Sequence, residues 1–313
     1  MSARVVILVA ALIAIAAIAL AAGPSGWRAP WPWDEVMALR APRVVLAGLV
    51  GASLALAGVA MQAMLHNDLA DPYVLGVSGG ASAGAVASLA LWPVVPAGPA
   101  AAVGAACAAT AVRALSRGPH DPTRTLLAGV AVGSLLGSAT GLILVLAPAD
   151  HVLRAATYWM FGGLGTPRWS AIAAPAIVLV VAIAWLRARA ERLDRLALGD
   201  DAAESLGVDV RGLRRRVMLA AIALTAVSVA VAGLIGFVGL IAPHAARRWV
   251  GARHRGLIPV AALGGAGLVI AADIAARAAF APREVPVGLV TAAIGGPFFL
   301  WQLQRAAASE VVA

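Results

Sequence analysis

Long apolar segments constrain this chain more than any other feature. A helix that crosses a bilayer needs about 20 apolar residues. Such segments, one of them shorter and interrupted by Pro243 and His244, lie near residues 5–22, 43–63, 74–92, 98–116, 125–147, 170–186, 217–235, 237–250, 257–276 and 287–303. Only 12% of the residues are charged, about half the usual share in soluble domains. The sequence therefore predicts an all-α polytopic membrane protein of about ten transmembrane helices, forming one domain over residues 1–313.

The arginines predict the orientation of the chain. Many of them fall in loops on the same side as Arg4 and Arg305, namely Arg113, Arg117 and Arg124, the arginines between Arg187 and Arg216, and Arg253 and Arg255. Cytoplasmic loops carry an excess of basic residues, so both termini are expected in the cytoplasm. This placement also accounts for the net charge of +9 without any nucleic-acid partner.

Two segments in different halves of the chain are alike. Ser53-Leu-Ala-Leu-Ala-Gly-Val59 is echoed by Ser228-Val-Ala-Val-Ala-Gly-Leu234, and the two lie on spans of opposite direction. Paired segments of this kind are typical of the inverted repeats of transporters, and they make a membrane scaffold without transport function an unfavoured alternative.

Glycines at a spacing of about four residues mark two of the spans. They are Gly76, Gly80 and Gly84 (with Gly79) in one span, and Gly129, Gly133 and Gly137 in another. Small residues on one helix face allow close helix packing. The alternative is that these faces line a pathway or a dimer seam.

A polar turn-forming sequence, HNDLADPYVLGVSGG, interrupts the apolar segments at residues 66–80. Asn67, Asp68 and Asp71 can supply turn hydrogen bonds, and Pro72 is suited to the first turn of a helix. Non-helical backbone at membrane depth is tolerated only where protein buries it or where it lines a wet cavity. The sequence is therefore either a passive turn or part of a gate.

The largest polar segment spans residues 187–216 and is predicted to be cytoplasmic. Within it Leu198, Ala202 and Leu206 share one face of a predicted short helix, and Asp200 and Asp201 occupy its first turn, which the helix dipole favours. So short a helix needs a surface to lie against. Its acidic residues disfavour an anionic membrane, and we expect a partner protein.

Motifs for catalysis are absent from the sequence. No phosphate-binding P-loop is present, so the chain is not expected to hydrolyse ATP. The histidines lack metal-ligand spacing, and we expect no catalytic residue, metal or cofactor. Asp273 and Arg277 lie four residues apart on one predicted helix face. We interpret them as a structural or docking pair rather than as the proton relay of an ion-coupled carrier.

Several motifs together resemble the FecCD-type permeases, the membrane subunits of ABC importers for ferric siderophores, haem and cobalamin. They include RAPRVVLAGLVGASLALAGVAMQAMLHNDLADPYVLGVSGGASAG, LGDDAAESLGV and GFVGLIAPHAARRWVG, and the similarity runs from about Arg40 to Trp301. The resemblance implies a type II ABC importer permease fold in the bacterial inner membrane, surrounded by membrane lipid. It also implies a homodimer with the pathway at its seam, a cytoplasmic ATPase dimer and a periplasmic substrate-binding protein.

Matching the family motifs residue by residue implies three sets of functional residues. The cytoplasmic gate or pathway set is Asn67, Leu69, Pro122 and Thr123; the ATPase-coupling set is Leu198, Asp200, Glu204, Leu206 and Gly207; the binding-protein docking set is Arg40, Arg43 and Arg277. One departure lies next to the gate, where Asp68 replaces a proline that is usual in the family.

The resemblance leaves the cargo open. Haem or a ferric siderophore is the first expectation because iron chelates are common cargoes of the family. The stretch from Tyr158 to Gly163 is similar to the cobalamin branch, so a cobalamin permease is the alternative. An ion-coupled secondary carrier that works without an ATPase is a less favoured one.

Overall fold

The computed structural model describes residues 3–21, 33–116, 122–147, 150–279 and 283–311, and within these ranges all regular structure is helical. Ten helices coincide with the ten predicted spans: α1 (Ala3–Ala21), α3 (Ala41–Leu65), α4 (Val77–Leu91), α5 (Ala97–Leu115), α6 (Pro122–Leu146), α8 (Ala173–Ala188), α11 (Val210–Ala232), α12 (Val238–Val250), α13 (His254–Ala278) and α14 (Val287–Val311). The all-α polytopic prediction is confirmed.

Length and composition qualify most of these helices as membrane spans. Among the described residues, 7 helices are long and apolar enough to cross a bilayer, and Val77–Leu91 and Val287–Gln302 are shorter apolar helices. Helix α12 is shorter still and contains Pro243. α11 begins at Val210 rather than near residue 217, because the Asp209 carboxylate caps it by accepting a hydrogen bond from the Gly212 amide at 2.9 Å.

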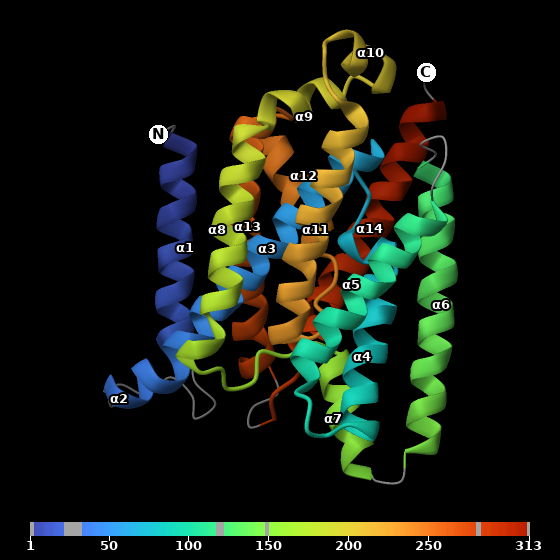
Figure 1. Cartoon of the computed structure of the whole chain (residues 1–313). Coiled ribbons are helices and arrows are strands. Elements are labelled where there is room, and N and C mark those ends of the chain that lie inside the picture. The colour runs from blue at the N-terminus through green and yellow to red at the C-terminus, as the bar shows by residue number, and fades with distance from the viewer. Residues whose placement is uncertain (1–2, 22–32, 117–121, 148–149, 280–282, 312–313) are drawn as a thin grey trace.

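Four short helices lie outside the spans. They are α2 (Trp33–Glu35), α7 (Asp150–Met160), α9 (Ala190–Leu196) and α10 (Asp200–Ser205), and of these only α10 corresponds to a predicted helix. Turns of π or 3-10 helix cover Val36–Arg40, Pro72–Leu75 and Trp169–Ala171. Figure 1 shows α9 and α10 at the end of the bundle where both chain termini lie, and α2 and α7 at the opposite end.

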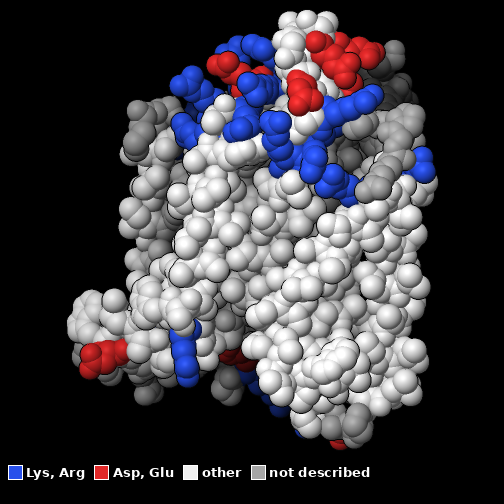
Figure 2. All heavy atoms as spheres, viewed as in Figure 1, with Lys and Arg blue, Asp and Glu red and all other residues white. Residues whose placement is uncertain are grey.

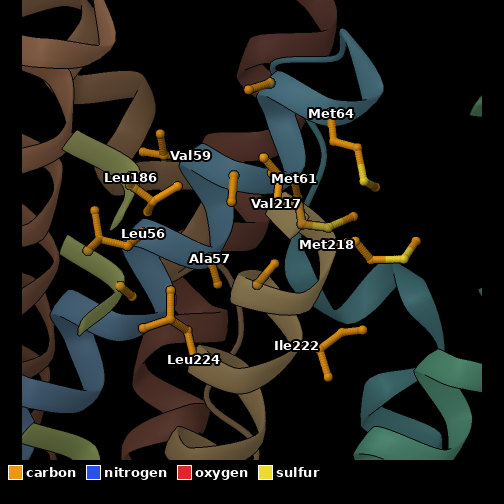
Figure 3. Close-up of a cluster of buried hydrophobic side chains, with 14 of the residues drawn as sticks. Leu56, Ala57, Val59, Met61, Met64, Leu186, Val217, Met218, Ile222 and Leu224 are labelled. Carbon is orange, nitrogen blue, oxygen red and sulfur yellow. The ribbon is translucent and has the colours of Figure 1, made fainter. Parts of the chain in front are cut away.

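Helix α3 is the central element of the bundle. It packs against α8, α11, α12 and α13 (Figure 1). In the most apolar 18-residue stretch of its span, 83% is buried, compared with 6% in the corresponding stretch of α1 and 11% in that of α6. Leu56 and Met61 of α3 are buried with Leu186 of α8 and Leu224 of α11 in one hydrophobic cluster (Figure 3). α1 and α6 are therefore the peripheral helices of this chain.

Charged side chains are distributed unevenly between the two ends of the bundle. On the face drawn in Figure 2, arginines and acidic residues gather around α9 and α10, and the surface below them is largely free of charge. An uncharged band of this kind suits the hydrocarbon region of a bilayer. The arginine-rich end is the end predicted to be cytoplasmic.

The two similar segments of the sequence lie on helices that run in opposite directions. In Figure 1, α3 runs toward α9, whereas α11 runs away from it, and the two helices are in contact. Their environments differ, because Gly58 is inside α3 whereas Gly233, with a φ of 65°, ends α11. Opposite direction is what an inverted repeat requires.

A break in the helical backbone separates α11 from α12. Residues 233–237 are non-helical, and Phe237 adopts a left-handed conformation with a φ of 66°. The Ile235 amide in this break donates a hydrogen bond to the Tyr73 hydroxyl at 3.2 Å. The break is thus buried against the 66–80 region, the condition under which irregular backbone is tolerated at membrane depth.

The closest approach of α3 to α13 depends on two glycines. A Cβ added to Gly51 would collide with the Gly265 carbonyl, and one added to Gly265 would collide with the Gly51 carbonyl and lie 2.5 Å from the Ala55 Cβ. Glycine is needed here because the two backbones are in direct contact.

We therefore predict that Gly265→Ala lowers the melting temperature of the purified protein in detergent, because α3 and α13 have to separate to admit the methyl group. Gly264→Ala is the matched control, since a Cβ at that position meets nothing within 4 Å. A helical Gly→Ala change without a clash stabilises by roughly 0.5–1 kcal/mol. Equal melting temperatures for the two variants would contradict the close approach.

Candidate gate and coupling face

The loop after α3 is a tight polar turn. α3 ends at Leu65, and His66 closes it in a left-handed conformation with φ 50° and ψ 35°. The Asn67 side-chain oxygen accepts a hydrogen bond from the Leu69 amide at 2.8 Å, and the Asn67 backbone carbonyl accepts one from the Ala70 amide at 3.1 Å. These contacts confirm that Asn67 supplies turn hydrogen bonds. We refer to residues 66–70 as the gate loop.

The chain continues from the gate loop through a second cap. The Asp71 carboxylate accepts a hydrogen bond from the Tyr73 amide at 2.9 Å, and Pro72 occupies the first turn of the Pro72–Leu75 helix, as expected. Burial raises the pKa of the Asp71 carboxyl to about 6, although the Tyr73 hydrogen bond opposes this shift. A protonated carboxyl is a poorer acceptor, so this cap weakens in acid.

A buried glutamine fixes the gate loop to α12. The Gln62 Nε2 donates to the carbonyls of Ala70 at 3.3 Å and Gly239 at 3.2 Å, and its Oε1 accepts from Arg247 at 2.6 Å. Gln62 and Arg247 were not among the predicted site residues. A clue to Gln62 was available, because it is a lone amide in an otherwise apolar segment, but its partner lies far along the chain.

Asp68 does not stabilise the turn itself. Its carboxylate lies 3.4 Å from a guanidinium nitrogen of Arg247, and its side chain is largely exposed. The negative charge that replaces the usual family proline is therefore balanced by α12. An exposed pair of this kind contributes about 0–1 kcal/mol.

The second predicted pair of gate residues lies at the start of α6. Pro122 and Thr123 form the first turn of that helix, so their backbone is described. Their side chains lie outside the described residues, and their role remains a prediction.

The coupling segment contains a shorter helix than the pattern of apolar residues predicted. α10 covers only Asp200–Ser205, between Gly199 with a φ of 101° and Gly207 with a φ of 77°. Leu198 and Leu206 therefore flank the helix rather than sharing a face with Ala202. The left-handed glycines end the helix on both sides, and amphipathic spacing alone does not show this.

Most of the predicted coupling residues lie on the surface. Leu198 is 66% exposed and Leu206 is 50% exposed, and Glu204 and Gly207 are also exposed. Asp200 differs, because its carboxylate binds Arg214 of α11 at 2.7 Å. Acidic residues occupy the first turn of α10 as predicted. Both leucines expose apolar side chains at the arginine-rich end of the bundle.

Helix α9 is fixed to α13 by a charged side chain. The Asp194 carboxylate accepts a hydrogen bond from the His254 backbone amide at 2.8 Å and lies 2.6 Å from the His254 Nδ1. This contact caps the first turn of α13 while it holds α9 in place. The coupling segment is therefore packed on the bundle.

At the opposite end of the bundle, Asp273 collects two arginines. Its carboxylate lies 2.9 Å from Arg43 of α3 and 3.0 Å from Arg277 of α13, which confirms the predicted Asp273–Arg277 pair. Arg43 also binds Glu284 at 3.0 Å. Arg40 donates to the Leu20 carbonyl at 3.1 Å. All three predicted docking arginines are buried within the chain, and their contact with a binding protein remains a prediction.

We expect Asp273→Asn to lower the free energy of unfolding by about 3–5 kcal/mol, because it leaves buried guanidinium groups without their carboxylate. Glu284→Gln removes the other carboxylate that binds Arg43, but Glu284 is partly exposed. It should change the free energy of unfolding by at most about 1 kcal/mol.

Denaturation of both variants under the same detergent conditions measures the difference. Comparable losses from the two changes would show that Asp273 has no special part in this cluster.

Known proteins are similar to this chain in sequence. A family model described as the FecCD transport family matches residues 4–305. The cobalamin import system permease protein BtuC of Halobacterium salinarum is 46% identical over 270 residues, which cover 85% of this chain and 72% of that protein. The hemin transport system permease protein HmuU of Yersinia pestis is 41% identical over 282 residues, with 87% and 84% covered.

The fold is also found among solved structures. One that is described as an inward-facing conformation of a metal-chelate type ABC transporter has a TM-score of 0.90 and 27% sequence identity. The alignment covers 97% of this chain and 100% of that chain. Helix order and spatial arrangement therefore agree over nearly the whole protein.

Proposed function

Because the chain belongs to the FecCD transport family, we propose that it is the permease subunit of an ABC importer that moves a metal chelate into the cytoplasm. The observation that carries this proposal is the exposed coupling segment around α10, placed at the arginine-rich end of a multi-span bundle. A carrier that works alone has no need of such a surface. ATP hydrolysis then belongs to a separate subunit.

The proposed topology places the arginine-rich end in the cytoplasm. Both chain termini lie at that end (Figure 1), as does the coupling segment. The positive-inside rule supports this orientation. A cytoplasmic ATPase dimer would then meet Leu198, Glu204, Leu206 and Gly207 directly, whereas Asp200 would hold α10 in place through Arg214.

The proposed pathway lies between two copies of the chain. Helix α6 supports this, since 11% of its most apolar window is buried, and Leu127, Val130 and Leu135 are largely exposed. A Cβ added to Gly137 meets nothing within 4 Å, so this face of α6 is open to a neighbour. Gly79 and Gly133, by contrast, are used in packing α4 against α6. Asn67, Leu69, Pro122 and Thr123 are proposed as gate residues of this pathway.

A periplasmic binding protein is proposed to dock at the opposite end, near Arg40, Arg43 and Arg277. These arginines already have partners inside the chain, so docking through them requires an exchange of carboxylates. Glu284 is the partner best placed for exchange, because its side chain is 31% exposed whereas that of Asp273 is 1% exposed. Acidic residues on the binding protein would then take its place at Arg43.

For the cargo we propose a metal chelate, with haem as the first candidate and cobalamin as the second. The two relatives described above carry hemin and cobalamin in their names. Both compounds are large metal–tetrapyrrole chelates, and one pathway of suitable width could serve either. Selectivity between them would then depend on the binding protein.

Reconstitution with the cognate ATPase and binding protein in liposomes tests the function. We expect ATP-dependent uptake of haem, measured beside cobalamin and ferric citrate. Uptake of any of these by the permease alone under an ion gradient would overturn the importer proposal in favour of an ion-coupled carrier. Uptake of cobalamin without haem would reverse the order of the two cargoes.

We also predict that Leu206→Asp reduces ATP-dependent uptake at least about tenfold, because a charge replaces the apolar contact with the ATPase. Leu206→Met keeps an apolar side chain of similar volume and should retain near-normal uptake. Leu206 is exposed, so neither change should alter thermal stability. Normal uptake with Leu206→Asp would remove this residue from the coupling surface.

A further inference from the structure

His66, the first residue of the gate loop, lies against the coupling segment. Its Nε2 is 2.6 Å from the carbonyl oxygen of Leu196, at the end of α9. Its Nδ1 is 3.2 Å from a terminal nitrogen of Arg214 on α11. The same Arg214 nitrogen donates to the Asp200 carboxylate at 2.7 Å. One imidazole therefore contacts both short helices of the coupling segment, α9 directly and α10 through Arg214.

The donors and acceptors in this chain of contacts fit only one arrangement of protons. A guanidinium group donates and never accepts, so the His66 Nδ1 accepts the hydrogen bond from Arg214. A neutral ring then carries its proton on Nε2 and donates it to the Leu196 carbonyl. The Arg214 nitrogen has two N–H groups, one for His66 and one for Asp200. Every contact is satisfied at once.

The backbone of His66 is part of the same rigid unit. It adopts the left-handed conformation, which is strained for a residue other than glycine. Its amide donates to the Gln62 carbonyl at the end of α3, and the next residue, Asn67, begins the hydrogen-bonded turn. A displacement of the ring therefore shifts the backbone from which the gate loop starts.

We propose that His66 is a positioning residue that transmits movement of the coupling segment to the gate loop. The inference rests on the proposed function, in which the ATPase moves that segment. The path runs from Asp200 through Arg214 to the His66 ring, with a second connection from the Leu196 carbonyl. When α9 or α10 moves, these hydrogen bonds displace the ring, and the ring displaces the backbone at the start of the gate loop.

A histidine that merely capped α3 would behave differently. Asparagine tolerates the left-handed conformation, so His66→Asn preserves the cap and keeps a side-chain acceptor near Arg214. It cannot reach the Leu196 carbonyl, because its side chain is shorter than the imidazole. If His66→Asn leaves the ATP hydrolysed per molecule imported unchanged, His66 is a simple helix cap. If that ratio rises, His66 transmits movement to the gate loop.

Hydrogen exchange of the permease alone, in lipid nanodiscs, tests the connection without any partner. Asp200→Asn weakens the hold on Arg214, and we expect the gate-loop amides of Asn67, Leu69 and Ala70 to exchange about tenfold faster, as for the loss of one charge-assisted hydrogen bond. Asp201→Asn is the matched control, since Asp201 is exposed and forms no ion pair among the described residues. Equal gate-loop exchange in the two variants would overturn the inference.

A double variant shows whether the effect passes through His66. In a His66→Gly background the left-handed cap is kept but the ring that contacts Arg214 is absent, and adding Asp200→Asn should accelerate gate-loop exchange less than it does in the native chain. Fully additive effects would mean that Asp200 and the gate loop are connected by another route, which contradicts the proposal.

The functional arm uses the complete transporter in liposomes, with haem and cobalamin as separate probes. His66→Asn should raise the ATP hydrolysed per molecule imported several-fold, with binding of the ATPase unchanged. An unchanged ratio would overturn the transmitting role. If the native transporter imports neither probe, the cargo proposal fails, whereas the exchange experiment still decides whether His66 connects the two sites.

Discussion

The absence of hydrogen-bond partners in the bilayer is the constraint on which this structure depends. Every backbone amide at membrane depth needs a partner within the protein, and helices supply one locally. The break between α11 and α12 is the informative exception. Its Ile235 amide is satisfied by the Tyr73 hydroxyl, so the non-helical backbone is possible only because the segment after the gate loop packs against it.

Close packing follows from the same constraint. Lipid tails are as apolar as the helix surfaces, so helices associate through tight contact rather than through exclusion of water. Backbone contacts at Gly51 and Gly265 bring α13 onto α3, and α3 becomes the buried axis of the bundle. The ion pairs and side-chain hydrogen bonds described above lie at the two ends of α3, around Asp273 at one end and around Gln62 and His66 at the other.

The sequence predicted the helices well because apolar length is a local property. The polar turn at Asn67 and the pairing of Asp273 with Arg277 were also accessible, since the partners lie within a few residues. The contacts of Gln62 with Arg247 and of His66 with Arg214 were not, because each joins positions more than a hundred residues apart that only the packed bundle brings together. The extent of α10 was overestimated because left-handed glycines, and not the spacing of leucines, decide where that helix begins and ends.

The small size of α10 has a consequence for any protein that binds there. A six-residue helix has little stability of its own in water. Here Asp200 in its first turn is bound to Arg214 of α11, and Ala203 is buried. The conformational entropy of ordering this surface is therefore lost when the permease folds, and not when a partner arrives. Such a surface can release a partner and bind it again without refolding. A force applied to α10 is transmitted to α11 through the Asp200–Arg214 ion pair and does not unfold the helix.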